Sequence, residues 1–208
     1  MRPAPERETQ NPAVAALVLA AGESRRMAPR NKLLIPDASG RAMVARVVDA
    51  VLASRAAPVL VVLGHQADAV REALAGRPVQ FVRAAEYAAG LSASLKAGLA
   101  ALPAASSAVL VCLGDMPLVS AAVLDRLVAV YAPDQGRRVV VPSFAGKWGN
   151  PVLWDRSFFA DILTLTGDVG ARRLLDRHRA SVTTVALTDD AVLRDFDTPE
   201  ALAALPQA

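Results

Sequence analysis

A glycine-containing segment followed by two cations is the first feature of this chain that could do chemistry. The segment reads Leu19, Ala20, Ala21, Gly22, and Arg26 and Lys32 follow it. Small residues let backbone N–H groups approach a triphosphate, and the cations supply the positive charge that phosphate oxygens require. The spacing is neither that of a Walker P-loop nor that of a dinucleotide fingerprint. The segment predicts a phosphate-binding loop, and the alternative is a turn with two solvated cations.

A carboxylate follows the most hydrophobic run of the chain. Asp115 comes directly after the apolar segment 108–113 and Gly114, and it is followed by Met116 and Pro117. A carboxylate oxygen beside a glycine can hold Mg²⁺ while water and phosphate fill the remaining coordination positions. Asp115 is therefore the predicted metal ligand, and the alternative is an aspartate that caps a turn before proline.

Two further aspartates lie near the C-terminus. Asp195 and Asp197 are spaced i and i+2, so on an extended segment both point to the same face and both could line one site. Asp197 also fits the N-cap of a helix that begins at Pro199. From the residues alone, one of the two would cap the helix, and only the company of Asp115 favours the other as a second metal ligand; the choice between Asp195 and Asp197 stays open.

Short apolar runs alternate with amphipathic ones from residue 13 onward, and they predict the elements that must position these groups. The predicted strands are 13–19, 59–63, 79–82, 108–113, 138–142, 182–187 and 192–196. The predicted helices are 43–52, 67–74, 92–102, 123–131, 156–163, 169–178 and one led by Pro199. Strands that are apolar on both faces are buried on both faces, which indicates a mostly parallel sheet between helical layers. We expect a three-layer α/β/α, Rossmann-like fold with one domain over 13–208 and a flexible tail over 1–12.

Composition limits the classes of partner. The net charge is +3, but the basic residues are scattered, so we expect no nucleic acid partner, while a few converging arginines suffice for a small anionic substrate. No apolar run approaches the roughly 20 residues that cross a bilayer, so we expect no membrane partner. The absence of a signal peptide predicts the cytoplasm. The single cysteine, Cys112, excludes a disulfide framework and reads as a core residue.

Six segments, in order, resemble the MobA-like NTP transferase family, and most closely its molybdenum cofactor cytidylyltransferases. The match runs from about Val14 to Leu205. The segments are 19–27 with Lys32, 90–98 (Gly-Leu-Ser-Ala-Ser-Leu-Lys-Ala-Gly), 114–117, 149–151, 167–172 and 195–199. The chain departs from the family pattern at Ala28, where glycine is usual, and at Asn150, where many relatives have histidine.

This resemblance implies roles for individual residues. It implies that Arg26 and Lys32 hold the phosphates above the loop at 19–22. It implies that three residues, Gly90, Ser92, Ser94, help to hold the base and ribose. By the same resemblance Asp115 and Asp197 would bracket Mg²⁺. The predicted acceptor-binding residues are Trp148, Gly149, Asn150, Asp168, Gly170. Among these, Trp148 lies beside a glycine in a loop and suits stacking, whereas Trp154 is as well explained by packing.

The implied activity is Mg²⁺-dependent transfer of CMP from CTP to the phosphate of the molybdenum cofactor, a phosphorylated pterin, with release of pyrophosphate. CTP is favoured over GTP because guanylyl relatives tend to open with Leu-Ala-Gly-Gly, whereas this chain has Ala21 before Gly22. Transfer of another nucleotide to another phosphorylated acceptor stays open. So does a non-catalytic carrier that delivers the molybdenum cofactor to a client such as a molybdenum hydroxylase.

Overall fold

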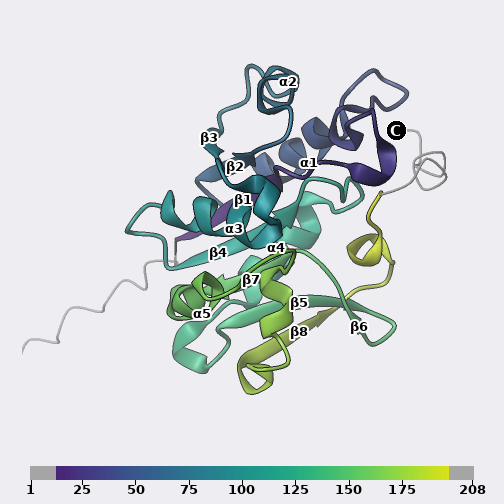
Figure 1. The fold of residues 1–208 in the computed structure, drawn as a ribbon. Helices are drawn as coiled ribbons and strands as arrows, with labels where there is room; N and C mark the ends of the chain where they lie inside the picture. Colours follow the sequence, from purple (N-terminus) through teal and green to yellow (C-terminus); the bar gives the residue numbers. More distant parts are fainter. Residues whose placement is uncertain (1–12, 197–208) are drawn as a thin grey trace, which may run out of the picture.

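A computed structural model describes residues 13–196 of the chain and shows a central sheet with helices on both faces (Figure 1). The strands are β1 Val14–Ala20, β2 Val59–Leu63, β3 Gln80–Arg83, β4 Ala108–Leu113, β5 Val139–Phe144, β6 Lys147–Trp148, β7 Val152–Asp155 and β8 Val182–Ala186. The helices are α1 Met43–Leu52, α2 Ala67–Ala73, α3 Leu91–Ala100, α4 Ala121–Val130 and α5 Phe159–Leu163. The predicted tail at 1–12, Asp197 and the Pro199-led helix lie outside the described residues.

The sheet is mixed and mostly parallel. Its strand order is β3-β2-β1-β4-β7-β5-β6, and β8 pairs with β5. The strands that carry the phosphate loop and Asp115, β1 and β4, are parallel neighbours with Leu17 opposite Val111. β7 and β6 pair antiparallel with their neighbours. Because β1 and β4 are adjacent and parallel, their carboxyl ends lie side by side at one edge of the sheet.

Alternation along β1 explains the three layers. Ala16 and Val18 point to the hydrophobic core that also contains Val48 of α1 and Leu124 of α4. Leu17 points to the second core, on the face covered by α3 and α5. All seven residues of β1 are buried, which is the condition for a strand covered on both faces. The predicted α/β/α layering is therefore confirmed.

Two predicted elements differ from the structure, and two strands of the structure are not predicted by the sequence. The segment 169–178 contains a short 3-10 helix, Ala171–Leu174, in place of an α-helix. A 3-10 turn also repeats its buried face every third residue, so Ala171 and Leu174 produce the same apolar pattern. The predicted strand 192–196 overlaps a 3-10 helix, Ala191–Leu193, and carries no ladder pairing. The strands β6 and β7 were not predicted, because apolar runs this short cannot be separated from loop.

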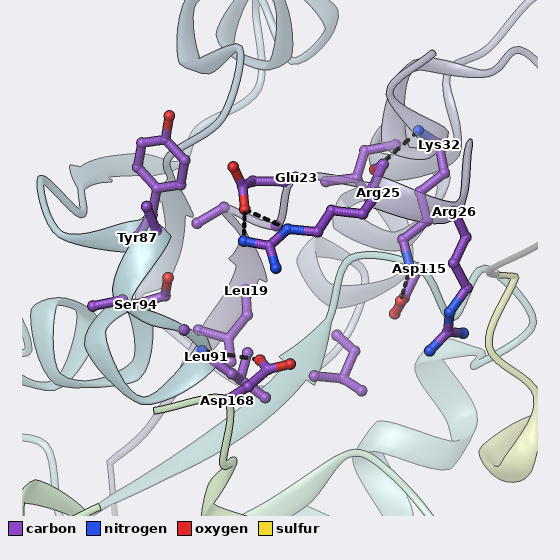
Figure 2. A pocket seen from close by; sticks show the side chains of 18 residues that line it. Leu19, Glu23, Arg25, Arg26, Lys32, Tyr87, Leu91, Ser94, Asp115 and Asp168 are labelled. Atoms are coloured by element: carbon purple, nitrogen blue, oxygen red, sulfur yellow. Dashed lines mark hydrogen bonds and ion pairs between the residues drawn. The ribbon is translucent and has the colours of Figure 1, made fainter. Parts of the chain in front are cut away.

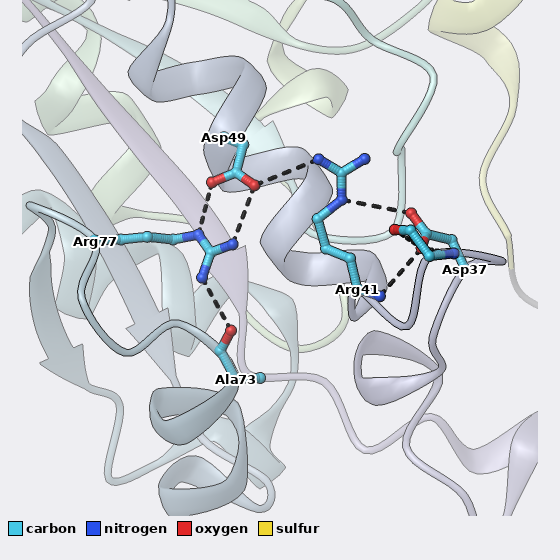
Figure 3. A network of polar contacts seen from close by, with 6 residues as sticks. Asp37, Arg41, Asp49, Ala73 and Arg77 are labelled. Carbon is cyan, nitrogen blue, oxygen red and sulfur yellow. Dashed lines mark hydrogen bonds and ion pairs between the residues drawn. The ribbon is translucent and has the colours of Figure 1, made fainter. Parts of the chain in front are cut away.

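A charged network fixes the turn that follows Lys32 (Figure 3). Arg41 contacts both Asp37 at 3.4 Å and Asp49 of α1 at 3.7 Å. Arg77 donates to both carboxylate oxygens of Asp49, at 2.6 and 3.0 Å, and to the carbonyl of Ala73 at the end of α2. Hydrogen bonds from the side chain of Ser39 and from nearby backbone N–H groups lower the pKa of Asp37 to about 2. The network therefore ties the segment after Lys32 to two helices.

No helix within 13–196 is long and apolar enough to cross a membrane.

Candidate active site

A cavity of about 500 Å³ opens at the carboxyl ends of β1 and β4 (Figure 2). Lys32, Arg26 and Asp115 lie on one side of it, and Tyr87, Leu91 and Ser94 lie on the other. Five of the predicted phosphate-binding residues line the cavity: Leu19, Ala21, Gly22, Arg26, Lys32. Ala20 is buried and does not line it. The cavity therefore lies at the carboxyl ends of the strands, where ligands bind in open α/β sheets.

Hydrogen bonds of the Ser24 side chain close the loop after β1. Ser24 has a left-handed backbone with φ 51° and begins a 3-10 helix, Arg25–Met27. Its hydroxyl donates to Asn31 Oδ1 at 3.3 Å and accepts from the backbone N–H of Lys32 at 3.2 Å. Asn31 is buried and also accepts from Leu33 N at 3.1 Å. These hydrogen bonds hold the start of the Lys32 segment against the phosphate loop.

Lys32 and Asp115 form an ion pair inside the cavity. Lys32 Nζ lies 2.5 Å from Asp115 Oδ2, and the side chains are 14% and 17% exposed. Gly114 permits this placement, because a Cβ there would lie 3.0 Å from the carbonyl oxygen of Leu19. The residues are 83 positions apart in sequence, so the β1–β4 pairing brings them together.

The second oxygen of Asp115 is left without a partner. Asp115 Oδ1 is buried and has no hydrogen bond. A buried acceptor without a partner costs about 1–3 kcal/mol, so the free protein holds an oxygen that would gain from a cation or a donor. A hard oxygen of this kind suits Mg²⁺ or Mn²⁺. Asp115 therefore fits the metal role in its chemistry.

Further metal ligands do not converge on Asp115 within residues 13–196. That part of the chain holds no cluster of three or more histidine, cysteine, aspartate or glutamate residues arranged around one point. Asp195 is exposed and does not line the cavity. The predicted role of Asp197 stays a prediction, since that residue lies outside the described part.

Several cavity residues gave no functional signal in the sequence. Arg25 donates through Nε and Nη2 to Glu23 Oε2, at 2.9 and 2.6 Å, and both residues of this ion pair line the cavity. Tyr87 packs closely over Gly64, where a Cβ would lie 2.6 Å from the tyrosine Cβ. Because the cavity separates Tyr87 from Lys32, an aromatic face is available at the end away from the cations (Figure 2).

The start of α3 borders the cavity. Gly90, Leu91 and Ser94 line the cavity. Gly90 and Ser94 are predicted nucleotide-binding residues, and a place in the cavity wall is what that role requires. Ser92 is buried and does not line it, and its hydroxyl donates to the carbonyl of Gly167 at 2.8 Å. The nucleotide-binding role of Ser92 stays a prediction.

A second cavity of about 560 Å³ adjoins the first, and both are lined by Leu19, Leu91, Leu113 and Asp168. Asn150 and Gly170, both predicted acceptor residues, line the second cavity together with Arg172 and Arg173, which were not predicted. Trp154 also borders it from the core and is fully buried. The two cavities therefore share a border, with Arg26 and Lys32 in the first cavity and Arg172 and Arg173 in the second.

Two predicted acceptor residues have other neighbours. Trp148 lines neither cavity, and the Arg179 guanidinium lies 5.1 Å from its ring centroid. Its carbonyl accepts a hydrogen bond from Arg172, which lines the second cavity. Gly149 also lines neither cavity, and a Cβ there would lie 2.3 Å from the carbonyl oxygen of Val192. The acceptor roles of Trp148 and Gly149 stay predictions. The contacts of the two residues are with other parts of the chain: Trp148 with Arg172 and Arg179, and Gly149 with Val192.

Other reactive side chains lie away from the cavities. Burial raises the pKa of the Cys112 thiol to about 12, so it stays protonated. His178 stacks edge-on against Phe158 with 4.9 Å between ring centroids. Neither His65 nor His178 lines either cavity. The cavity residues therefore offer cations and carboxylates, with no histidine among them.

Comparison with known proteins gives a family match and several full-length likenesses. The sequence profile of the MobA-like NTP transferase domain matches residues 16–182. The bifunctional protein GlmU of Kineococcus radiotolerans is 41% identical over 128 residues, covering 60% of this chain and 26% of that protein. The chain thus spans about a quarter of the length of the GlmU proteins that it matches. Nicotine blue oxidoreductase of Paenarthrobacter nicotinovorans is 28% identical over 198 residues, which cover 93% of this chain and 96% of that protein.

Solved structures share the whole architecture. Rv0371c of Mycobacterium tuberculosis superposes with a TM-score of 0.82 at 28% identity, covering 96% of this chain and 100% of that one. A structure of Rv0371c in complex with manganese superposes with a TM-score of 0.77 at 27% identity and the same coverage. These likenesses extend the match from the sequence profile to nearly the whole chain.

Proposed function

The chain belongs to the MobA-like NTP transferase family and is a nucleotidyltransferase, and we propose that it transfers CMP from CTP to the phosphate of the molybdenum cofactor. The observation that carries the proposal is the Lys32–Asp115 pair, which lies inside a cavity beside the phosphate loop. A cation and a carboxylate with one free oxygen are the groups that a metal-bound triphosphate requires at its reacting phosphorus.

The layout of the cavity orients the nucleotide. The cations Arg26 and Lys32 lie opposite Tyr87 and Ser94 (Figure 2). A triphosphate over Gly22 would direct its phosphates to the cations and its base to the side of Tyr87 and Leu91. The α-phosphate would then lie between Lys32 and the second cavity, where the acceptor enters.

The proposed reaction is an in-line displacement. An oxygen of the acceptor phosphate forms a bond to the α-phosphorus, the bond from the α-phosphorus to the bridging oxygen breaks, and pyrophosphate leaves with the electron pair. Lys32 would meet the charge that grows on the α-phosphoryl oxygens, and Arg26 would hold the leaving pyrophosphate. Asp115 Oδ1, with Asp197 as the proposed second ligand, would hold Mg²⁺, which supplies charge neutralisation at the phosphate oxygens.

The second cavity is the proposed acceptor site. Asn150, Asp168 and Gly170 border it, and Arg172 and Arg173 add positive charge. An anionic acceptor would place its phosphate near Leu19 and Leu113, which line both cavities, and its remainder toward the arginines. A phosphorylated pterin fits this division, and a molybdenum hydroxylase would be the client. Because the reaction consumes a nucleoside triphosphate, the cytoplasm is the proposed location.

Pyrophosphate release tests the proposal directly. The protein is incubated with Mg²⁺, each of the four NTPs in turn, and molybdenum cofactor, and pyrophosphate is assayed. The expected result is release that requires both CTP and the cofactor. Binding of the molybdenum cofactor without pyrophosphate release would identify a carrier. Pyrophosphate release with another phosphorylated acceptor would replace the acceptor in the proposal and leave nucleotidyl transfer standing. The Paenarthrobacter relative is named as an oxidoreductase. The reaction is therefore decided by this assay and not by sequence similarity to that relative.

We expect CTP to be preferred over GTP. Ala21 is 4% exposed and lines the nucleotide cavity, so its methyl group narrows the space above the loop more than glycine would. A difference of one methyl is worth about 1–3 kcal/mol, which is roughly 10- to 200-fold in kcat/KM. The measurement compares kcat/KM for CTP and GTP, first in the natural protein and then in Ala21→Gly, where the ratio should fall. Equal or better use of GTP by the natural protein would contradict the cytidylyl proposal and leave nucleotidyl transfer standing.

We expect a pH profile without a histidine base. A phosphate monoester has its second pKa at about 6 and is largely dianionic at neutral pH, so the acceptor can attack without a protein base. Activity should rise through that region and then level off. His65 lines neither cavity and donates its backbone N–H to Ala21, so His65→Ala should keep the profile. A folded His65→Ala protein without activity would show that the mechanism needs a histidine.

A further inference from the structure

The loop that borders the second cavity takes the place of a cap on helix α3. The N-cap of α3 is Gly90, which has no side chain to accept the first N–H groups. Instead, Leu91 N donates to Asp168 Oδ1 at 3.3 Å, and Ser92 N donates to the carbonyl of Gly167 at 3.2 Å. The N-terminal groups of a helix must find such partners. Here the partners come from a segment about 75 residues further along the chain.

The contact between the two segments is close. Ser92 is 3% exposed, and its hydroxyl adds a second bond to the Gly167 carbonyl at 2.8 Å. Gly90 has φ 110°, and a Cβ there would lie 2.4 Å from the carbonyl carbon of Gly167. Any other residue at Gly90 would therefore separate the two segments. Three hydrogen bonds and this backbone contact define the seam between 90–92 and 167–168.

The seam lies at the border of the two cavities. Gly90 and Ser94 line the nucleotide cavity and not the second, Gly170, Arg172 and Arg173 line the second cavity and not the first, and Leu91 and Asp168 line both. Figure 2 shows Asp168 against Leu91, and both residues line both cavities. A ligand that orders the first turn of α3 therefore also orders the segment attached to it.

We propose that Ser92 is a positioning residue through which nucleotide binding at α3 fixes the segment 167–173 for the acceptor. The proposal rests on the proposed function, because it takes the first cavity as the nucleotide site. Ordering of a shared element by one ligand lowers the entropic cost for the second and gives positive cooperativity without a large movement. The nucleotide would then favour acceptor binding, and the acceptor would favour nucleotide binding by the same factor.

Hydrogen–deuterium exchange of the full-length protein tests the coupling without turnover. The probe is Mg²⁺ with α,β-methylene-CTP, whose α–β bridge cannot be cleaved. In the natural protein, exchange should slow both in the loop 19–27 and in 170–175, where we expect a factor of about five or more. In Ser92→Ala the slowing at 19–27 should remain, and the nucleotide-dependent slowing at 170–175 should fall below about twofold.

The matched control is Ser106→Ala. Ser106 is also 3% exposed but lines neither cavity, so this variant should keep the nucleotide-dependent slowing at 170–175. A purely structural role for Ser92 would change exchange at 170–175 equally with and without nucleotide. Undiminished nucleotide-dependent slowing in Ser92→Ala would overturn the coupling proposal. No slowing at 19–27 in the natural protein would instead contradict nucleotide binding in the first cavity, which is a failure of the proposed function.

Discussion

Replacing Asp115 with asparagine is expected to lower pyrophosphate release by about 10³-fold while the protein stays folded. Asparagine can keep one oxygen toward Lys32 Nζ, as Oδ2 is at 2.5 Å now. It then places an N–H donor where the buried, unpartnered Oδ1 lies. A donor at that point repels a cation and offers no ligand oxygen. The measurement is the steady-state rate of pyrophosphate release, with thermal unfolding followed by circular dichroism.

A binding measurement separates the metal role from other effects of this change. Mn²⁺ affinity in the presence of α,β-methylene-CTP, measured by electron paramagnetic resonance, should weaken in Asp115→Asn. The matched control is Asp68→Asn, an exposed aspartate on α2 that lines neither cavity, and it should leave rate and Mn²⁺ affinity unchanged. A folded Asp115→Asn protein with near-natural turnover would show that Asp115 does not hold the metal.

The sheet could be predicted where burial on both faces leaves a continuous apolar run. The segments 59–63 and 108–113 have the predicted bounds. The parallel pairing of β1 and β4 places the loop after β1 beside Asp115, although Lys32 and Asp115 are 83 positions apart. The strand β7 has four residues and follows Pro151, so it is too short for hydrophobic periodicity to identify it as a strand. The 3-10 turn at 171–174 has the apolar spacing of a helix, which the pattern alone cannot distinguish from an α-helix.

The candidate site was predictable only in part, for a related reason. Residues in the phosphate loop and Asp115 follow strands, so topology alone places them at one edge. Tyr87 and Arg25 line the cavity because of the backbone conformation of the segments that carry them. No local sequence pattern marks that conformation. The bond from Ser92 to Gly167 joins segments 75 positions apart, so the residue could be found from the resemblance while its contact could not. Long-range loop contacts are therefore the part that required the structure.

Replacing Lys32 with alanine is expected to lower kcat by about 10²- to 10³-fold and to raise the KM for CTP by a smaller factor. In the structure, Lys32 Nζ pairs with Asp115 at 2.5 Å, so its charge is held beside the position where the α-phosphate would lie. An interaction that strengthens as the phosphoryl charge grows acts on kcat, whereas uniform phosphate binding acts on KM. Steady-state kinetics with CTP as the varied substrate give both constants.

The same change should strengthen metal binding in the absence of nucleotide. Without the lysine, the carboxylate of Asp115 loses a cation 2.5 Å away that competes with Mn²⁺ for it. Removing that competition should lower the Kd for Mn²⁺ in nucleotide-free Lys32→Ala, while Asp115→Asn should raise it. Lys32→Arg should restore kcat only in part, because a planar guanidinium does not reproduce the compact ammonium charge. A Lys32→Ala protein with natural kcat and a raised KM alone would restrict Lys32 to phosphate binding, and unchanged Mn²⁺ affinity would show that the lysine and the metal do not compete for Asp115.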